Sequence, residues 1–129
     1  MNNDYYIPKH KFDFEAVEKI RNADEVSIQP YLQQIFEWVE DINWPVAKEL
    51  VKVLVKFDTL IIPFLKDLIQ KPDGLREYSF YYFMLPLLTD KQLSLIKEDL
   101  ERVAKNPTSF EKKENYDKIA RKHLTKVDK

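Results

Sequence analysis

Residues 44–72 read WPVAKELVKVLVKFDTLIIPFLKDLIQKP, and residues 79–107 read SFYYFMLPLLTDKQLSLIKEDLERVAKNP. The two stretches match in register at an offset of 35 residues, which places apolar residue on apolar residue and proline on proline. The matched pairs are Ile61 with Ile96, Leu65 with Leu100, Leu68 with Val103, Ile69 with Ala104 and Pro72 with Pro107. A repeat of this length is typical of stacked helix pairs. Since one helix pair cannot bury its apolar face alone, neighbouring pairs share one core. The side surfaces of the stack then stay free to bind partners.

Apolar residues at spacings of three and four predict seven helices along the chain. The expected ranges are Asp13–Asn22, Ser27–Glu40, Asn43–Phe57, Thr59–Lys71, Asp73–Leu85, Thr89–Asn106 and Thr108–Val127. Asp13 and Asn43 are the expected N-caps of the first and third helices. Thr89 and Thr108 each stand three residues before a glutamine or glutamate, which is the pattern of a capping box. The aromatic run within Tyr78–Leu85 also suits a strand, although its match to the third helix favours a helix.

The composition indicates a globular domain without cysteine chemistry or a membrane span. Of the 129 residues, 44% are apolar and 33% are charged, and the formal net charge is −1. The absence of cysteine excludes a disulfide framework. The longest strongly apolar run, Tyr78–Leu88, is shorter than the roughly 20 residues that span a bilayer. Because residues 1–4 lack the basic and apolar regions of a secretory signal, we expect a cytoplasmic protein.

Residues 38–47 read WVEDINWPVA and contain the pattern W-x-x-D-x-N-W-P-V-A. This stretch resembles a bacterial family of uncharacterised helical domains with HEAT-like repeats, domain of unknown function 5071. Residues 8–13 (PKHKFD) resemble the opening segment of that family, and residues 100–108 (LERVAKNPT) resemble its closing turn. The resemblance implies an all-helical fold in a bacterial, cytoplasmic protein, and it brings no catalytic residue or cofactor. It also suggests, more loosely, a link to small domains that stand beside toxin systems as immunity proteins.

We therefore expect an all-α fold, a HEAT-like right-handed stack of three antiparallel helix pairs closed by a C-terminal capping helix. The first pair ends near Glu40, and the helix after Thr108 covers the open end of the stack. The short loops between the expected helices suit antiparallel neighbours. Gly74 is the one glycine in the sequence, which argues against many tight hairpins. No segment is typical of a linker, so residues 1–129 are expected to form one domain.

The main candidate for binding is the stretch from Asp24 to Asn43, which has a formal charge of −5 and contains no lysine or arginine. Its acidic residues are Asp24, Glu25, Glu37, Glu40 and Asp41. Two tryptophans flank its end, and we predict a surface there for a basic protein, because carboxylates steer such partners and tryptophans anchor them. The predicted surface consists of Glu37, Trp38, Glu40, Asp41 and Trp44. In the alternative interpretation, both tryptophans belong to the core and Asn43 only caps a helix.

A second candidate surface is aromatic. Successive helical residues are about 100° apart, so the aromatic side chains between Tyr78 and Phe83 cannot all face one side. Tyr81 and Phe83 are the candidates for a contact with a second copy of the chain. The alternative is burial of most of these rings beneath the last two helices. The oligomeric state stays open.

The C-terminal segment Thr108–Lys129 carries a net charge of +3. Nucleic-acid binding through this segment is the alternative function. Its cations are Lys112, Lys113, Lys118, Arg121, Lys122, Lys126 and Lys129. Phosphate binding needs a sustained basic surface, and the acidic residues interleaved with these cations argue against it. An ordinary solvated helix face explains the same pattern.

Residues suited to catalysis or metal binding are few. His10 and His123 are the only histidines and lie near opposite ends of the chain, so we expect both at the surface without a metal. The neighbouring carboxylates at positions 40–41 and 98–99 point in different directions on a helix and suit solvated faces better than acid–base chemistry. The sequence contains neither a nucleophile elbow nor a glycine-rich phosphate loop.

These patterns favour a non-enzymatic protein–protein interaction module without a metal or cofactor. Its concrete form is an immunity-type protein that neutralises a basic partner through the acidic face. A nucleic-acid-binding repeat protein that uses the basic C-terminal helix is the alternative. An enzyme with an unrecognised carboxylate site ranks third, and membrane binding is not expected because the core occupies the apolar stripes.

Overall fold

The computed structural model describes residues 5–71 and 74–127, and every regular element within these ranges is helical. The all-α prediction is therefore confirmed. The α-helices are α1 (Phe14–Arg21), α2 (Glu25–Ile28), α3 (Leu32–Glu37), α4 (Pro45–Leu54), α5 (Ile62–Gln70), α6 (Leu75–Ser79), α7 (Asp90–Leu95), α8 (Lys97–Lys105), α9 (Ser109–Lys113) and α10 (Tyr116–Leu124). Between them lie the 3-10 helices η1 (Gln29–Tyr31), η2 (Val55–Ile61) and η4 (Leu85–Leu87) and the π-helix η3 (Phe80–Met84). In the described ranges, none of these helices combines the length and the apolar character that crossing a membrane requires.

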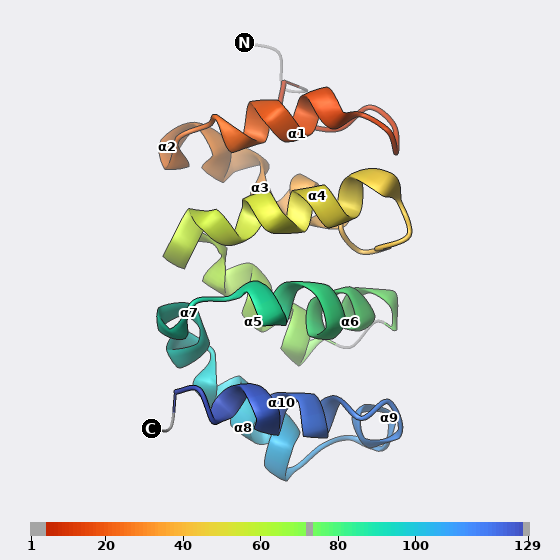
Figure 1. The fold of residues 1–129 in the computed structure, drawn as a ribbon, viewed down its shortest axis with the longest axis vertical. Helices are drawn as coiled ribbons and strands as arrows, with labels where there is room; N and C mark the ends of the chain where they lie inside the picture. The colour runs from red at the N-terminus through yellow and green to blue at the C-terminus, as the bar shows by residue number, and fades with distance from the viewer. Residues whose placement is uncertain (1–4, 72–73, 128–129) are drawn as a thin grey trace.

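The helices lie across the long axis of the molecule in successive layers (Figure 1). α1 and α2 lie at one end, α3 and α4 follow, α5 and α6 come next, and α8, α9 and α10 lie at the other end. α1 packs against α4, α5 packs against both α6 and α8, and α8 packs against α10. One hydrophobic cluster runs through these layers from Tyr6 to Leu124. The layers therefore share a continuous core.

The 35-residue offset relates two helices that are alike in length and in burial. α5 and α8 are each nine residues long, and their ends stand 35 residues apart. The matched residues other than the two prolines are all buried. They are Ile61, Leu65, Leu68 and Ile69 in the first copy and Ile96, Leu100, Val103 and Ala104 in the second. Pro72, the last residue matched, lies outside the described residues. The repeated spacing thus marks equivalent core positions.

The helix caps follow the side-chain pattern at three of the four expected places. The Oδ1 atom of Asp13 accepts a hydrogen bond from the amide of Ala16 at 3.2 Å, and both Thr89 and Thr108 open a complete capping box. The prediction for Asn43 is wrong, because Trp44 is the N-cap of α4. Pro45 is the first helical residue, and a proline forces the residue before it into an extended conformation; Trp44 has ψ 130°.

Two expected helices are interrupted by local backbone geometry, and a further bend falls between two expected helices. Asp58, at φ 55°, bends the chain inside η2 between α4 and α5. Asn115, at φ 64°, divides the expected last helix into α9 and α10, because asparagine tolerates the left-handed conformation better than most residues. Ile96 separates α7 from α8 with φ −112° and ψ 14°. The expected start at Asp73 lies outside the described residues, and α6 begins at Leu75 after Gly74.

The aromatic segment is helical, so the strand alternative is wrong. It forms α6 and then the π-helix η3, in which the wider turn places Phe80, Tyr81 and Met84 in the core. Pro86 lies in the short η4 that ends this run. The segment packs against α4 of the preceding layer through η3.

Several polar side chains are buried at the C-terminal end of the stack. Glu111 is fully buried and accepts two hydrogen bonds from Arg102, at 2.6 and 2.9 Å. His123 is 4% exposed, so its expected surface location is wrong; it lies on the same face of α10 as Ala120 and Leu124. Burial, with smaller contributions from the charges of Lys126 and Lys122, lowers the pKa of His123 to about 4. His10 is exposed, as expected.

Candidate partner-binding surface

The loop at residues 38–44 brings the two tryptophans together. Trp38 directly follows α3 and Trp44 directly precedes α4, so the turn between these helices folds one indole toward the other. Their ring centroids lie 5.1 Å apart with a tilt of 58°. Trp44 is 38% exposed, and Trp38 is half-buried against the core. The interpretation that both tryptophans are core residues is therefore wrong.

Four of the five predicted binding residues line one open hollow. Its walls are Glu37, Trp38, Glu40 and Trp44, and its volume is about 420 Å³. The fifth residue, Asp41, is half-buried and shapes the loop instead, because its Oδ1 atom accepts a hydrogen bond from the amide of Asn43 at 3.0 Å. The structure thus places two indoles and two carboxylates around a single opening, which we call the tryptophan hollow.

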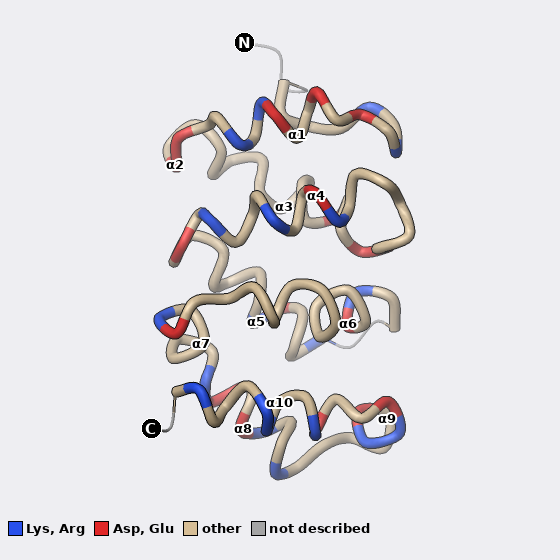
Figure 2. The backbone as a smooth tube through the Cα atoms, viewed as in Figure 1, with Lys and Arg blue, Asp and Glu red and all other residues tan. Residues whose placement is uncertain are grey.

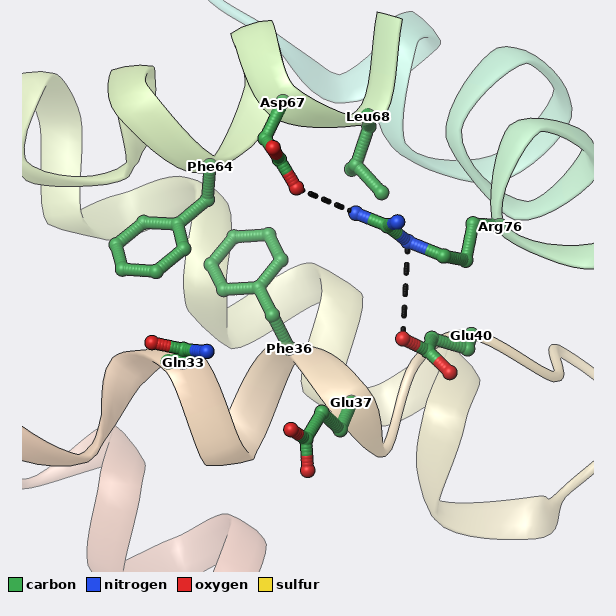
Figure 3. Close-up of a pocket in the computed structure, with 8 residues that line it drawn as sticks. All are labelled: Gln33, Phe36, Glu37, Glu40, Phe64, Asp67, Leu68 and Arg76. Atoms are coloured by element: carbon green, nitrogen blue, oxygen red, sulfur yellow. Dashed lines mark hydrogen bonds and ion pairs between the residues drawn. The ribbon is translucent and has the colours of Figure 1, made fainter. Parts of the chain in front are cut away.

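A second hollow lies beside the first and shares Glu37 and Glu40 with it (Figure 3). Its volume is about 170 Å³. It is lined by Gln33, Phe36, Glu37, Glu40, Phe64, Asp67, Leu68 and Arg76. The rings of Phe36 and Phe64 stack across it with centroids 4.9 Å apart and planes 8° from parallel. This contact joins α3 to α5, so the hollow spans two layers of the stack.

Arg76 of α6 occupies the second hollow and neutralises part of its acidic wall (Figure 3). Its Nη2 atom donates to Oδ2 of Asp67 at 2.7 Å, and its Nε atom lies 3.6 Å from Oε1 of Glu40. Hydrogen bonds from Arg76 and then from Lys71 lower the pKa of Asp67 below its usual range. The sequence analysis missed Arg76 and Asp67, because nothing in their spacing links them to residues 37–41.

Glu37 differs from Glu40 in its surroundings. It is exposed, and within the described residues its carboxylate has neither an ion pair nor a side-chain hydrogen bond. The guanidinium of Arg76 reaches Glu40 but not Glu37. The tryptophan hollow therefore presents one carboxylate that no cation of the described chain compensates.

The acidic stretch expected from the sequence does not form one continuous patch. Asp24 and Glu25 belong to the start of α2, which lies at the opposite edge of the stack from the loop at residues 38–44 (Figures 1 and 2). Asp24 caps α2 by accepting a hydrogen bond from the amide of Ser27 at 2.8 Å. The acidic character near the tryptophans comes from residues 37–41 alone.

The candidate contact at Tyr81 is wrong. Tyr81 is 1% exposed, and its ring stacks on that of Tyr116 with centroids 4.3 Å apart, so α10 covers it. Phe83 is half-buried, with the amine of Lys48 5.5 Å from the centre of its ring. The exposed tyrosines of this segment are Tyr78 and Tyr82, each 45% exposed.

The basic C-terminal region has a more positive surface than its sequence indicates. Glu111 is fully buried against Arg102, and Asp117 is 7% exposed with its Oδ2 atom 3.3 Å from Arg121. The exposed lysines on and after α9 and α10 are Lys112, Lys113, Lys118, Lys122 and Lys126. Two of the interleaved acids are therefore buried, whereas these cations are exposed. Lys129 lies outside the described residues.

Residues 5–71 and 74–127 contain no metal-binding arrangement of side chains. A metal site needs three or more histidine, cysteine, aspartate or glutamate side chains grouped together, and no such group is present in these ranges. The neighbouring carboxylates at positions 40–41 and 98–99 take part in separate contacts. Glu40 faces Arg76, Asp41 supports its own loop, and Asp99 accepts a hydrogen bond from Gln70 at 2.9 Å.

A family model described as a domain of unknown function (DUF5071) matches residues 6–124. The match includes the tryptophan hollow, the repeated helices and nearly all of the hydrophobic cluster. No curated protein matches the sequence. Because the family model spans almost the whole chain, the protein belongs to the DUF5071 family.

Proposed function

We propose that this protein is a non-enzymatic protein–protein interaction module that binds a basic partner protein at the tryptophan hollow. The observation that carries the proposal is the pairing of two partly exposed indoles with Glu37, a carboxylate without an ion pair in the described chain. Tryptophan is enriched among the residues that dominate binding energy. A carboxylate beside the indoles favours partners of the opposite charge.

The proposed architecture suits this role. It is a HEAT-like right-handed stack of three antiparallel helix pairs with a C-terminal capping helix. The equal lengths and equivalent burial of α5 and α8 at a 35-residue offset support it, as does the layered arrangement in Figure 1. In such stacks each layer buries the next, and binding residues of proteins often lie on loops that a rigid scaffold positions. The tryptophan hollow is formed at one of these loops.

The specific form of the proposal is an immunity-type role in the bacterial cytoplasm. The protein would cover a basic surface of a toxin and so block the contact through which the toxin acts. Such an inhibitor needs a rigid surface and complementary charge rather than catalytic groups. The hollow lies at the junction of α3 and α4, whose apolar residues are held in the hydrophobic cluster. This packing supports a binding surface that is formed before the partner arrives.

The proposal predicts that a basic protein is encoded beside this gene, and the test is its binding to this protein, measured by calorimetry with purified components. Glu37→Lys is expected to weaken binding about tenfold or more, because it places a cation against a cationic partner. The matched control is Glu25→Lys, which makes the same charge change on α2 at the opposite edge. Equal affinities for the two variants would refute binding at the tryptophan hollow.

A second candidate function is nucleic-acid binding at the basic C-terminal end. The burial of Glu111 and Asp117 favours it, because the exposed lysines there face few acids. Fluorescence anisotropy with duplex and single-stranded oligonucleotides at low salt tests this candidate. Binding that falls steeply with added salt, and that is lost in Lys118→Glu/Lys122→Glu, would support it. No change in anisotropy at low salt would reject it.

A further inference from the structure

The tryptophan hollow has the shape and charge of a receptor for one cationic side chain. Its opening is bounded by two indoles that meet at 58°, so their faces form a corner rather than a flat surface. Cations bind over the faces of aromatic rings, and tryptophan is the strongest of the rings in this respect. Glu37 stands on the rim with its carboxylate not engaged by any cation in the described residues.

The neighbouring hollow contains an internal example of the same chemistry. There Arg76 places its guanidinium between the carboxylates of Asp67 and Glu40, in a hollow that two stacked phenylalanine rings also line (Figure 3). Glu40 stands between the two hollows and is already approached by Arg76 at 3.6 Å. In the tryptophan hollow the aromatic rings and a carboxylate are present, and an arginine of this chain is not among the lining residues.

We infer that the partner inserts an arginine side chain into the tryptophan hollow, where its guanidinium packs against Trp38 and Trp44 and donates hydrogen bonds to Glu37. This inference rests on the proposed function and names the group that is recognised. Arginine fits better than lysine for three reasons. Its guanidinium is planar and stacks on indole, it presents a fork of donors that matches a carboxylate, and it is less strongly hydrated than an ammonium group.

The two tryptophans of the sequence are the two that line the hollow, so tryptophan emission, excited at a wavelength that tyrosine does not absorb, reports on this site. The probes are acetylated and amidated tripeptides that differ only in the central side chain, Gly-Arg-Gly, Gly-Lys-Gly and Gly-citrulline-Gly. Citrulline keeps the shape of arginine and removes its charge. Quenching of free N-acetyltryptophanamide by each peptide is subtracted from the signal.

The arginine peptide is expected to bind with saturation and about fivefold or more tightly than the citrulline peptide, because cation–π attraction and the carboxylate contact both need the charge. It is also expected to bind more tightly than the lysine peptide. Glu37→Gln, which retains both indoles, should reduce the preference for arginine over citrulline and leave only the part due to cation–π attraction. Glu25→Gln makes the same change on α2 and should leave the preference intact.

The possible results separate this inference from the proposed function. Equal binding of the arginine and lysine peptides would refute arginine recognition and leave recognition of a basic partner standing. The same preference in Glu37→Gln and in the unmodified protein would refute the role of Glu37. If none of the peptides binds, the inference fails, whereas the proposed function is judged separately by the Glu37→Lys experiment with the complete partner.

Discussion

Arg76 is the residue that most changes the electrostatics expected from the sequence. It comes from the layer after the acidic loop and lies between Asp67 and Glu40. It supplies a cation to both of these carboxylates, whereas Glu37 has no ion pair in the described residues. The chemistry of this surface is therefore set by two layers of the stack together.

Replacement of Arg76 by glutamine tests this contribution through pH dependence. Because the folded pKa of Asp67 lies below its usual value, the ion pair stabilises the fold above about pH 4, and this stability is lost as the pH falls through the folded pKa. Arg76→Gln should lower the free energy of unfolding by about 0.5–1 kcal/mol at pH 7, since the pair is partly solvated. The difference from the unmodified protein should shrink below pH 4. Urea denaturation at pH 7 and pH 3 measures both values, and an equal difference at the two pH values would contradict the assignment.

His123 contributes in the same direction as Asp67, over a higher range of pH. Its folded pKa of about 4 lies below the usual value of 6.5, so the unfolded chain takes up a proton at a higher pH than the folded protein does. Stability should therefore fall by roughly 2 kcal/mol between pH 6.5 and pH 4 because of this residue. His123→Gln should show a flatter dependence over the same range. NMR titration of the imidazole checks the pKa directly, and a value near 6.5 would show that the ring is hydrated in solution.

Sequence reasoning found part of the candidate site and missed the rest for identifiable reasons. Glu37, Trp38, Glu40 and Trp44 are close in the chain, so their local spacing was enough to group them. Arg76 joins them only through the packing of α6 on α5, which local spacing does not encode. The contact with a second copy was wrong for Tyr81, whose ring is instead buried against Tyr116 of α10, in line with the alternative of burial beneath the last two helices.

At the scale of the helical elements, apolar periodicity located each helical region, and backbone geometry decided where the helices break. The predicted ranges ran through Ile96 and Asn115, where the helices break, whereas the bend at Asp58 falls between two predicted ranges. Asn115 is followed by Tyr116, whose ring must reach the core at Tyr81, and the change of direction allows this. Such breaks depend on tertiary packing, whereas capping boxes depend on residues three apart, which explains why the boxes were predicted correctly.

Gln92 links two elements and provides a test at this scale. It is fully buried, and its Nε2 atom donates to the carbonyls of Val55 and Asp58 at 2.9 and 3.1 Å. Gln92→Ala leaves these carbonyls and the amide of Thr89 without a side-chain partner, so it should destabilise the protein by about 2–3 kcal/mol. Ser94→Ala on the same helix, at an exposed position, should change stability by less than about 0.5 kcal/mol. Thermal and urea unfolding compare the two, and similar values would show that the bridge contributes little.

At the scale of the whole molecule, the shared core predicts that the layers unfold together. Leu65 and Leu100 are equivalent by the repeat and are both fully buried. Either Leu→Ala change should cost about 2–5 kcal/mol through lost burial and a cavity. Both tryptophans lie far from Leu100 along the stack, near α3 and α4, and so report on a different layer.

The Leu100→Ala variant should therefore shift the unfolding transition seen by tryptophan fluorescence as much as the transition seen by circular dichroism. In a protein whose layers unfold separately, fluorescence would follow the unmodified protein while circular dichroism moved. Coincident curves would confirm coupling along the stack, and separate curves would reject it.

Contacts from α6 fasten the loop at residues 38–44 from the neighbouring layer. Ser79 donates a hydrogen bond to the carbonyl of Glu40 at 3.0 Å, and Arg76 lies against the side chain of the same residue. A bound partner that immobilises this loop must also restrain α6. Amide hydrogen exchange in α6 should consequently slow when the tryptophan hollow is occupied, even where the ligand touches no atom of that helix.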